Sequence, residues 1–326
     1  MSKWIDDSQR VFLEITNRCN FDCIFCPLGI SERVRQDMDP RLAFSLIDQL
    51  QELGFNRMIY FHVLGEPLLH PSVFDIVDHA AEAGMRPILF TNGGALTERI
   101  VQRVLASKVS ELVISMQTIN RQSYEMLRKT PFDWDTYLSR IQAALAAANE
   151  AEDGCVFRVS MGIKKTDTSH PEELYFAEYE SLEQIKESIA AIFSQVEGID
   201  LTEAFSALDA RGPENMPIIH INDSLSLSVK PMGNWRRIWQ DEPVSSGHCP
   251  IFGKELAVLS SGDVTFCHID YDGRTAIGNL TEKPLMDIIN TPQVEEMSAD
   301  FISGRSVPRG CKYCRGVKTK PAERSR

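Results

Sequence analysis

The 326-residue sequence lacks any apolar run that approaches the roughly 18 residues of a membrane span. Its start, MSKWIDDSQR, lacks the apolar segment of a secretory signal peptide. Positive charge is also scarce, because 34 lysines and arginines stand against 46 aspartates and glutamates, for a net charge of −12. Broad electrostatic binding of nucleic acid is therefore not expected. We expect a cytoplasmic protein without membrane or nucleic-acid partners, whose acidic surface suits neutral or cationic small molecules.

The remaining composition is that of a folded protein. Hydrophobic residues make up 43% of the chain and charged residues 25%, which argues against extensive disorder. The length is about twice a domain of ~150 residues, which predicts one large domain and one smaller one. No internal repeat or low-complexity segment is evident.

Segments with the period of a strand alternate with segments of helical period along the first two hundred residues. Helices are expected at 40–53, 72–83, 97–107 and within 121–152, followed by an acidic helical region to about 197. Strands are expected at 11–17, 58–64, 87–90, 111–116, 155–162 and 198–205. This alternation predicts an α/β fold with a parallel sheet, and six units make a partial (βα)6 TIM-like barrel.

The chain then divides into four expected parts. Residues 1–206 form the barrel, and 207–248 form an irregular linker in which Trp235 and Trp239 pack against the barrel. Residues 249–316 form a small second domain, which opens with a hairpin that turns at Ser261-Gly262-Asp263. The basic segment 317–326 is expected to be a disordered tail.

Polar side chains gather on one face of the expected strands, near their C-terminal ends. In a barrel alternate side chains point inward, so these residues are expected to line a site, since unpaired buried polar groups are costly. A hydrated barrel mouth with purely structural contacts is the alternative. The inward-facing candidates for substrate contact and catalysis are Glu14, His62, Gln117 and Arg158.

Seven of the eight cysteines fall into two groups, and the first is Cys19-x3-Cys23-x2-Cys26, directly after the first strand. The active sites of parallel barrels lie at this C-terminal face of the strands. Three thiolates can hold three irons of a cubane cluster and leave the fourth iron open to a ligand. A zinc knuckle completed by a distant residue remains the alternative at this point.

The segment ITNRCNFDCIFCP resembles the radical S-adenosylmethionine (SAM) superfamily, whose hallmark is C-x3-C-x-aromatic-C. LGEP at 64–67 is similar to that family's Gly-Gly-Glu motif, with Leu64 in place of the first glycine, and TNG at 91–93 resembles a further family pattern. The resemblance implies a [4Fe–4S] cluster on Cys19, Cys23 and Cys26. It also implies SAM contacts from Phe25, Gly65, Glu66, Asn92 and Ser115, with Glu66 meeting the ammonium group.

The same resemblance implies the chemistry. The cluster would pass one electron to SAM and release a 5′-deoxyadenosyl radical, which abstracts a hydrogen atom from the substrate. The protein would position the substrate and exclude water. A flavodoxin or ferredoxin is the expected reductant.

The second group is Cys249-x12-Gly262-x4-Cys267 followed by Cys311-x2-Cys314. Four cysteines can complete either a zinc ribbon or a cubane cluster. The segment resembles the SPASM and twitch extensions of radical SAM enzymes, and four cysteines fit the shorter twitch form with one auxiliary [4Fe–4S] cluster. His248 and His268 flank this group and are expected at the surface.

These observations favour a radical SAM oxidoreductase, of dehydrogenase or epimerase type, that acts on a small polar metabolite such as a sugar or aminocyclitol, by oxidation, epimerisation or dehydration. An auxiliary cluster held by four cysteines has no open iron and favours dehydrogenation. The remaining cysteine, Cys155, is expected to be a buried small hydrophobe. If it instead donated hydrogen to a substrate radical, epimerisation would be favoured. A peptide-modifying maturase and a non-catalytic iron–sulfur electron carrier are the alternatives.

Overall fold

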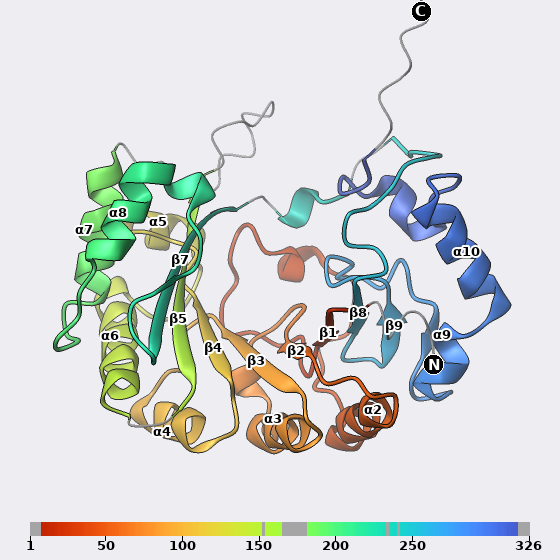
Figure 1. Cartoon of the computed structure of the whole chain (residues 1–326), viewed down its shortest axis with the longest axis horizontal. Helices are drawn as coiled ribbons and strands as arrows, with labels where there is room; N and C mark the ends of the chain where they lie inside the picture. Colours follow the sequence, from red (N-terminus) through yellow and green to blue (C-terminus); the bar gives the residue numbers. More distant parts are fainter. Residues whose placement is uncertain (1–7, 152–153, 165–180, 233–234, 240–241, 319–326) are drawn as a thin grey trace, which may run out of the picture.

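The computed structural model describes residues 8–151, 154–164, 181–232, 235–239 and 242–318. Within them the strands form one sheet that curves around a central space (Figure 1). The order across the sheet is β10 (Gly278–Asn279), β9 (Asp263–Thr265), β8 (Glu255–Val258), β1 (Arg10–Leu13), β2 (Met58–Phe61), β3 (Arg86–Thr91), β4 (Glu111–Ser115), β5 (Val156–Lys164), β7 (Leu225–Met232) and β6 (Ile219–His220).

Six of these strands, β1 to β5 and β7, pair in parallel and make the barrel wall. Apolar residues alternate along the strands and face the surrounding helices, as Leu112, Phe157 and Leu225 do in one register row. The predicted parallel α/β barrel is therefore confirmed.

Helices cover the outer side of the curved sheet (Figure 1). Asp39 caps the first of them by accepting a hydrogen bond from the Arg41 N–H, and Pro40 occupies the first helical position, as the sequence predicts. The described helices are α2 (Pro40–Glu52), α3 (Val73–Glu82), α4 (Glu98–Ala106), α5 (Arg121–Leu127), α6 (Trp134–Glu150), α7 (Leu182–Ile192), α8 (Thr202–Arg211), α9 (Leu285–Ile289) and α10 (Pro292–Ile302). No helix in these described ranges is long and apolar enough to cross a membrane.

The expected strand at 198–205 is wrong, because helix α8 begins at Thr202. The sixth parallel strand is β7, which lies inside the segment 207–248 that was expected to be irregular. Its sequence LSLSVKPM alternates apolar and polar residues, and the apolar set packs into the main core. The domain limits at 206 and 249 stay a prediction.

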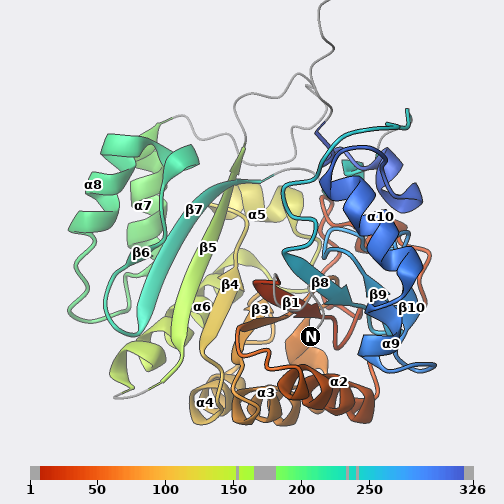
Figure 2. The ribbon, with the colours of Figure 1, turned by 45° about the vertical axis from the view of Figure 1, so that its right-hand side comes forward.

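The C-terminal part continues the barrel sheet (Figure 2). Strand β8 pairs in parallel with β1, from Arg10 opposite Glu255 to Leu13 opposite Val258. The predicted hairpin is confirmed, since β8 and β9 are antiparallel and Gly262 in their turn has a φ of +89°, which favours glycine. Residues 165–180, part of the expected acidic helical region, and the tail from 319 onward lie outside the described residues.

Candidate active site

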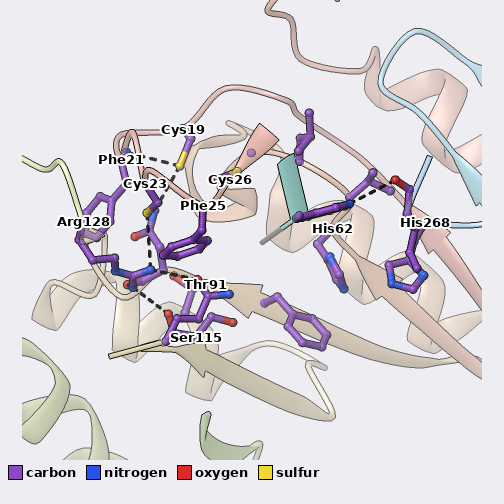
Figure 3. Close-up of a pocket in the computed structure, with 18 of the residues that line it drawn as sticks. Cys19, Phe21, Cys23, Phe25, Cys26, His62, Thr91, Ser115, Arg128 and His268 are labelled. Carbon is purple, nitrogen blue, oxygen red and sulfur yellow. Dashed lines mark hydrogen bonds between the residues drawn. The ribbon is translucent and has the colours of Figure 1, made fainter. Parts of the chain in front are cut away.

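A pocket opens beside the loop that follows β1, and the first cysteine group lies at one end of it (Figure 3). Cys19, Cys23 and Cys26 all line this pocket, which has a volume of about 450 Å³. A volume of this size is typical of pockets for small molecules and cofactors. Of the residues that the family resemblance implies for SAM, Phe25, Gly65, Asn92 and Ser115 also line the pocket.

A close backbone crossing fixes the cysteine loop against the loop after β2. Gly65 has a φ of +84°, and a Cβ atom there would lie 2.3 Å from the carbonyl oxygen of Thr16. The adjacent Glu66 N–H donates a 2.8 Å hydrogen bond to the Arg18 carbonyl. Glycine in the LGEP segment therefore allows this segment to touch the start of the cysteine loop.

The thiols are held in surroundings that oppose their ionisation. Burial raises the pKa of Cys19 to about 12 and that of Cys26 to about 11. A bound metal cluster removes this penalty, because metal ligation deprotonates thiols and supplies the compensating charge. The Phe21 N–H and the Asn92 side-chain amide each donate a hydrogen bond to Cys19 Sγ at 3.4 Å, as outer partners of thiolate ligands do.

Within the described ranges, no three His, Cys, Asp or Glu side chains are placed as ligands of a single metal ion. The fit of this site to an iron–sulfur cluster therefore rests on its donor set, three thiols that face one pocket.

Arg128, which directly follows α5, is the buried cation of this end of the pocket. Its Nη2 donates to the carbonyl oxygens of Asn92 at 3.1 Å and Ser115 at 2.7 Å, so that it joins the ends of β3 and β4. Its Nη1 lies 3.8 Å from Cys23 Sγ. Its Nε is buried and has no hydrogen-bond partner among the described residues. An unpaired buried donor of a guanidinium group next to the cysteines suits an anionic group such as a carboxylate.

Glu66 lies just outside the pocket lining and is buried. Burial raises its pKa to about 7, although the N–H groups of Asn92 at 2.6 Å and Leu68 at 3.2 Å donate to its carboxylate. An ammonium group bound nearby would favour the ionised form, which fits the implied contact with the amino group of SAM.

We expect SAM affinity to rise with pH between about 6 and 7.5, because the Glu66 carboxylate ionises in this range while an α-ammonium group keeps most of its protonation. A Glu66→Gln variant should bind SAM about tenfold more weakly above neutral pH, and its affinity should not depend on pH in this range. Anaerobic equilibrium dialysis of SAM at several pH values measures this. Equal pH dependence in both proteins would contradict the assignment of Glu66.

The other end of the pocket is formed by rings and one lysine, and Figure 3 shows His62 and His268 there, apart from the cysteine loop. Their ring centroids are 6.0 Å apart, and His62 packs on Phe90 at 4.2 Å. Burial lowers the pKa of His62 to about 3, and the charge of a protonated His268 is the second cause of this shift. His62 is therefore a neutral imidazole at neutral pH. His268 Nδ1 lies 2.7 Å from the buried Glu255 carboxylate, which holds the orientation of the ring.

Sequence reasoning missed several residues of this pocket. His268, expected at the surface, lines the pocket, and so do Trp235, Lys230 and Arg128. A histidine next to a ligand cysteine was the available signal for His268. For Lys230 the signal was the alternation of β7, which was not recognised as a strand.

The four substrate-facing candidates separate into two pairs. His62 and Gln117 line the pocket, and Gln117 has the unusual φ of +53°. Glu14 and Arg158 do not line it; Glu14 pairs with Arg33, and Arg158 pairs with Glu111 at 3.1 Å. The catalytic roles of all four stay a prediction.

The second cysteine group lies in the C-terminal segments, around a small apolar cluster that contains Phe252, Phe266 and Phe301. Burial raises the pKa of Cys267 and of Cys311. The charge of Cys311 raises the pKa of Cys267 further, which indicates that the two thiols lie close together. Cys249 and Cys314 in turn raise the pKa of Cys311. The buried Asp270 carboxylate raises the pKa of three of the thiols, and it accepts hydrogen bonds from the N–H groups of Arg274 and Thr275. This donor set fits one iron–sulfur cluster.

Comparison with known families decides the identity of the barrel. The model of the radical SAM superfamily matches residues 13–177, which is half of the chain. The chain belongs to the radical SAM superfamily. A second family model, the SPASM iron–sulfur cluster-binding domain, matches residues 249–315. The cofactors of this radical SAM enzyme are therefore SAM, a SAM-binding [4Fe–4S] cluster and an auxiliary iron–sulfur cluster.

Individual relatives cover different parts of this radical SAM enzyme. The S-adenosyl-L-methionine-dependent 2-deoxy-scyllo-inosamine dehydrogenase of Niallia circulans is 35% identical over 106 residues, which are 32% of this chain and 42% of that protein. PqqA peptide cyclase of Xanthomonas campestris pv. campestris is 25% identical over 317 residues, 93% of this chain and 78% of that protein. The crystal structure of BtrN in complex with AdoMet and 2-DOIA superposes with a TM-score of 0.53 at 18% identity and covers 96% of this chain and 93% of that one. The chain spans less than half the length of the dehydrogenase, so this match leaves the substrate open.

Proposed function

We propose that this radical SAM enzyme oxidises a secondary alcohol of a small polar metabolite to a carbonyl group. The observation that carries the proposal is the division of the pocket, with three cysteines at one end and His62 and His268 at the other, where Lys230 lies close enough to His62 to affect its pKa. The dehydrogenase relative and the similarity of fold to BtrN support this choice of substrate size.

When bound, SAM and the clusters would supply a hydrogen-abstracting radical and an acceptor for a second electron. Cys19, Cys23 and Cys26 would hold the first cluster, and Cys249, Cys267, Cys311 and Cys314 the auxiliary one. Arg128 and Glu66 would bind the carboxylate and ammonium groups of SAM, with Phe25, Gly65, Asn92 and Ser115 around the rest of the molecule.

The neutral imidazole of His62 would accept a hydrogen bond from the substrate hydroxyl and orient the C–H bond toward the cysteine end of the pocket. The alcohol would become the carbonyl product by loss of one hydrogen atom from the carbinol carbon to the radical that SAM supplies, of the hydroxyl proton to the His62 imidazole and of one electron to the auxiliary cluster. Phe90 and Trp235 would exclude water from the substrate.

The position of Cys155 favours oxidation over epimerisation. Cys155 is buried directly before β5, at the opposite end of the parallel strands from the cysteine loop. Its sulfhydryl group lies 3.5 Å from the carbonyl oxygen of the adjacent Val156. This is the environment of a small apolar residue, away from the pocket where a hydrogen donor would be needed.

The test is product analysis in deuterated water. We expect the reconstituted enzyme, given SAM, dithionite and a panel of sugars and cyclitols, to yield a product that has lost two hydrogens and carries no solvent deuterium at the reacting carbon. A product of unchanged formula with one deuterium at an inverted carbon would instead establish epimerisation and overturn the proposal.

A matched pair of variants tests the role of His62 in the same assay. His62→Leu should lower product formation at least tenfold and leave SAM affinity unchanged, because His62 lies at the end of the pocket away from the cysteines. The control His79→Leu changes a histidine that pairs with Asp48 on the outer helices and should have full activity. Unaltered turnover in His62→Leu would exclude His62 from substrate contact.

Modification of a peptide is the second candidate, because the alignment with PqqA peptide cyclase spans nearly the whole chain. A short open reading frame beside the gene, whose peptide product changes mass when the two are co-expressed, would favour this candidate over the metabolite dehydrogenase.

A further inference from the structure

Three serines form a row on the inner face of the barrel. Ser115 of β4 is the register partner of Ser160 of β5, and Ser160 is the partner of Ser228 of β7. Their neighbours Ile114, Val159 and Leu227 point to the opposite face and pack into the main core. Ser115 lines the pocket, whereas Ser160 and Ser228 are buried in the inner wall behind the lining residues.

Ser226 adds a fourth hydroxyl on the same face of β7. It is fully buried, and its Oγ has no hydrogen-bond partner in the described part of the chain. Unsatisfied buried hydroxyls are costly and are rarely retained without a ligand or water to bond them. The inner wall behind the pocket is therefore polar, although Ser226 itself does not line the pocket.

Lys230 stands two residues beyond Ser228, on the same face, and lines the pocket. Two guanidinium groups near this end are already neutralised, Arg158 by Glu111 at 3.1 Å and Arg10 by Glu255 at 3.0 Å. Within the described ranges Lys230 has no carboxylate partner, and the lining residues include no carboxylate. Burial and the nearby Arg158 lower the pKa of Lys230, as expected for an ammonium group without a counter-ion.

We propose that the substrate is a small polar molecule that carries a carboxylate or phosphate group, with this group bound by Lys230 and a substrate hydroxyl bound by His62. This assignment rests on the proposed function, for which it names the substrate class. An anionic substrate differs from the neutral or cationic small molecule that the net charge of −12 suggests. The reason is that the local charge at the pocket, and not the average charge of the surface, selects the ligand.

The test is binding to the anaerobic holoenzyme with SAM present, by isothermal titration at constant ionic strength. The four probes are D-glucuronate, D-glucose 6-phosphate, D-glucose and D-glucosamine. Each contains a pyranose ring of the same configuration, so the probes differ mainly in charge. We expect at least one acidic probe to bind at least tenfold more tightly than glucose, and glucosamine to bind most weakly. The tighter of the two acidic probes identifies the anionic group.

Variants of Lys230 test whether this residue causes the preference for acidic over neutral probes. Lys230→Met should reduce the advantage of the acidic probe to less than twofold, and Lys230→Arg should keep most of it. The control is Lys186→Met, a partly buried lysine of α7 that pairs with Glu183 and Asp209 and does not line the pocket, and it should bind like the wild type.

The proposal is overturned if glucose or glucosamine binds as tightly as the acidic probes, if no probe binds, or if Lys230→Met keeps the preference. Because binding is read without turnover, these outcomes are separate from the oxidation itself. An epimerised product would overturn the proposed reaction and leave a measured preference for anions intact.

Discussion

Replacement of Arg128 with methionine is expected to weaken SAM binding by about 100-fold. Methionine keeps most of the side-chain length but removes every donor that Arg128 directs at the carbonyls of Asn92 and Ser115 and at the pocket. Loss of one member of a buried charged contact costs about 2–5 kcal/mol, which corresponds to a factor of roughly 30 to several thousand in affinity.

The measurement is anaerobic equilibrium dialysis of SAM, normalised to the iron content of each preparation. Arg128→Lys should recover part of the affinity, because lysine restores the charge but not the planar fork of donors. The control Arg140→Met alters an arginine that packs on Phe132 at 4.3 Å and does not line the pocket. SAM affinity within threefold of wild type in Arg128→Met would show that Arg128 only supports the strand ends.

Replacement of Glu14 with alanine is expected to lower the free energy of unfolding by about 3–5 kcal/mol, because it leaves a largely buried arginine without its counter-ion. Glu14 is fully buried and pairs with Arg33, whose side chain is 12% exposed. The carboxylate also accepts hydrogen bonds from the Leu64 N–H at 2.9 Å and the Ser260 N–H at 3.0 Å. One carboxylate thereby connects β1, the loop after β2 and the turn of the C-terminal hairpin.

A double-mutant cycle with Arg33 distinguishes this structural role from catalysis. Anaerobic urea titrations of Glu14→Gln, Arg33→Met and the double variant should show the double variant to be less destabilised than the sum of the two single changes. The exposed pair of Glu82 and Lys108 serves as the control, and Glu82→Gln should leave the unfolding midpoint unchanged. If Glu14→Gln folded with normal stability but lost turnover while Arg33→Met kept it, Glu14 would be catalytic after all.

The sequence predicted the parts of the molecule that local patterns encode. Helix α2 shows a capping aspartate and a proline at its start, and β1 to β5 show the period of strands, so these elements could be placed from neighbouring residues. The cysteine loop was predicted because its ligands lie within eight residues of one another. Strand β7 was missed because it pairs with β5, whose register partners precede it by more than sixty residues, and because a short alternating stretch alone is a weak signal.

The charged residues of the site show a second limit of sequence reasoning. Arg128, at the end of α5, and Lys230, near the end of β7, occupy positions where charged side chains are usually exposed to solvent, so nothing local shows that they line a pocket. The inward direction of Glu14 followed from strand alternation. Its partner Ser260 is 246 residues away, and only the folded chain brings the two together.

The parallel pairing of β8 with β1 makes the C-terminal segment part of the barrel wall. A shortened chain that ended before the hairpin would lose three of the four auxiliary cysteines and also expose the backbone donors and acceptors of β1 as a free edge. Free edges of this kind recruit other chains and promote aggregation. The barrel and the C-terminal segment therefore share one continuous sheet, and a C-terminal segment from a relative could replace this one only if it also supplied a strand in the register of β8.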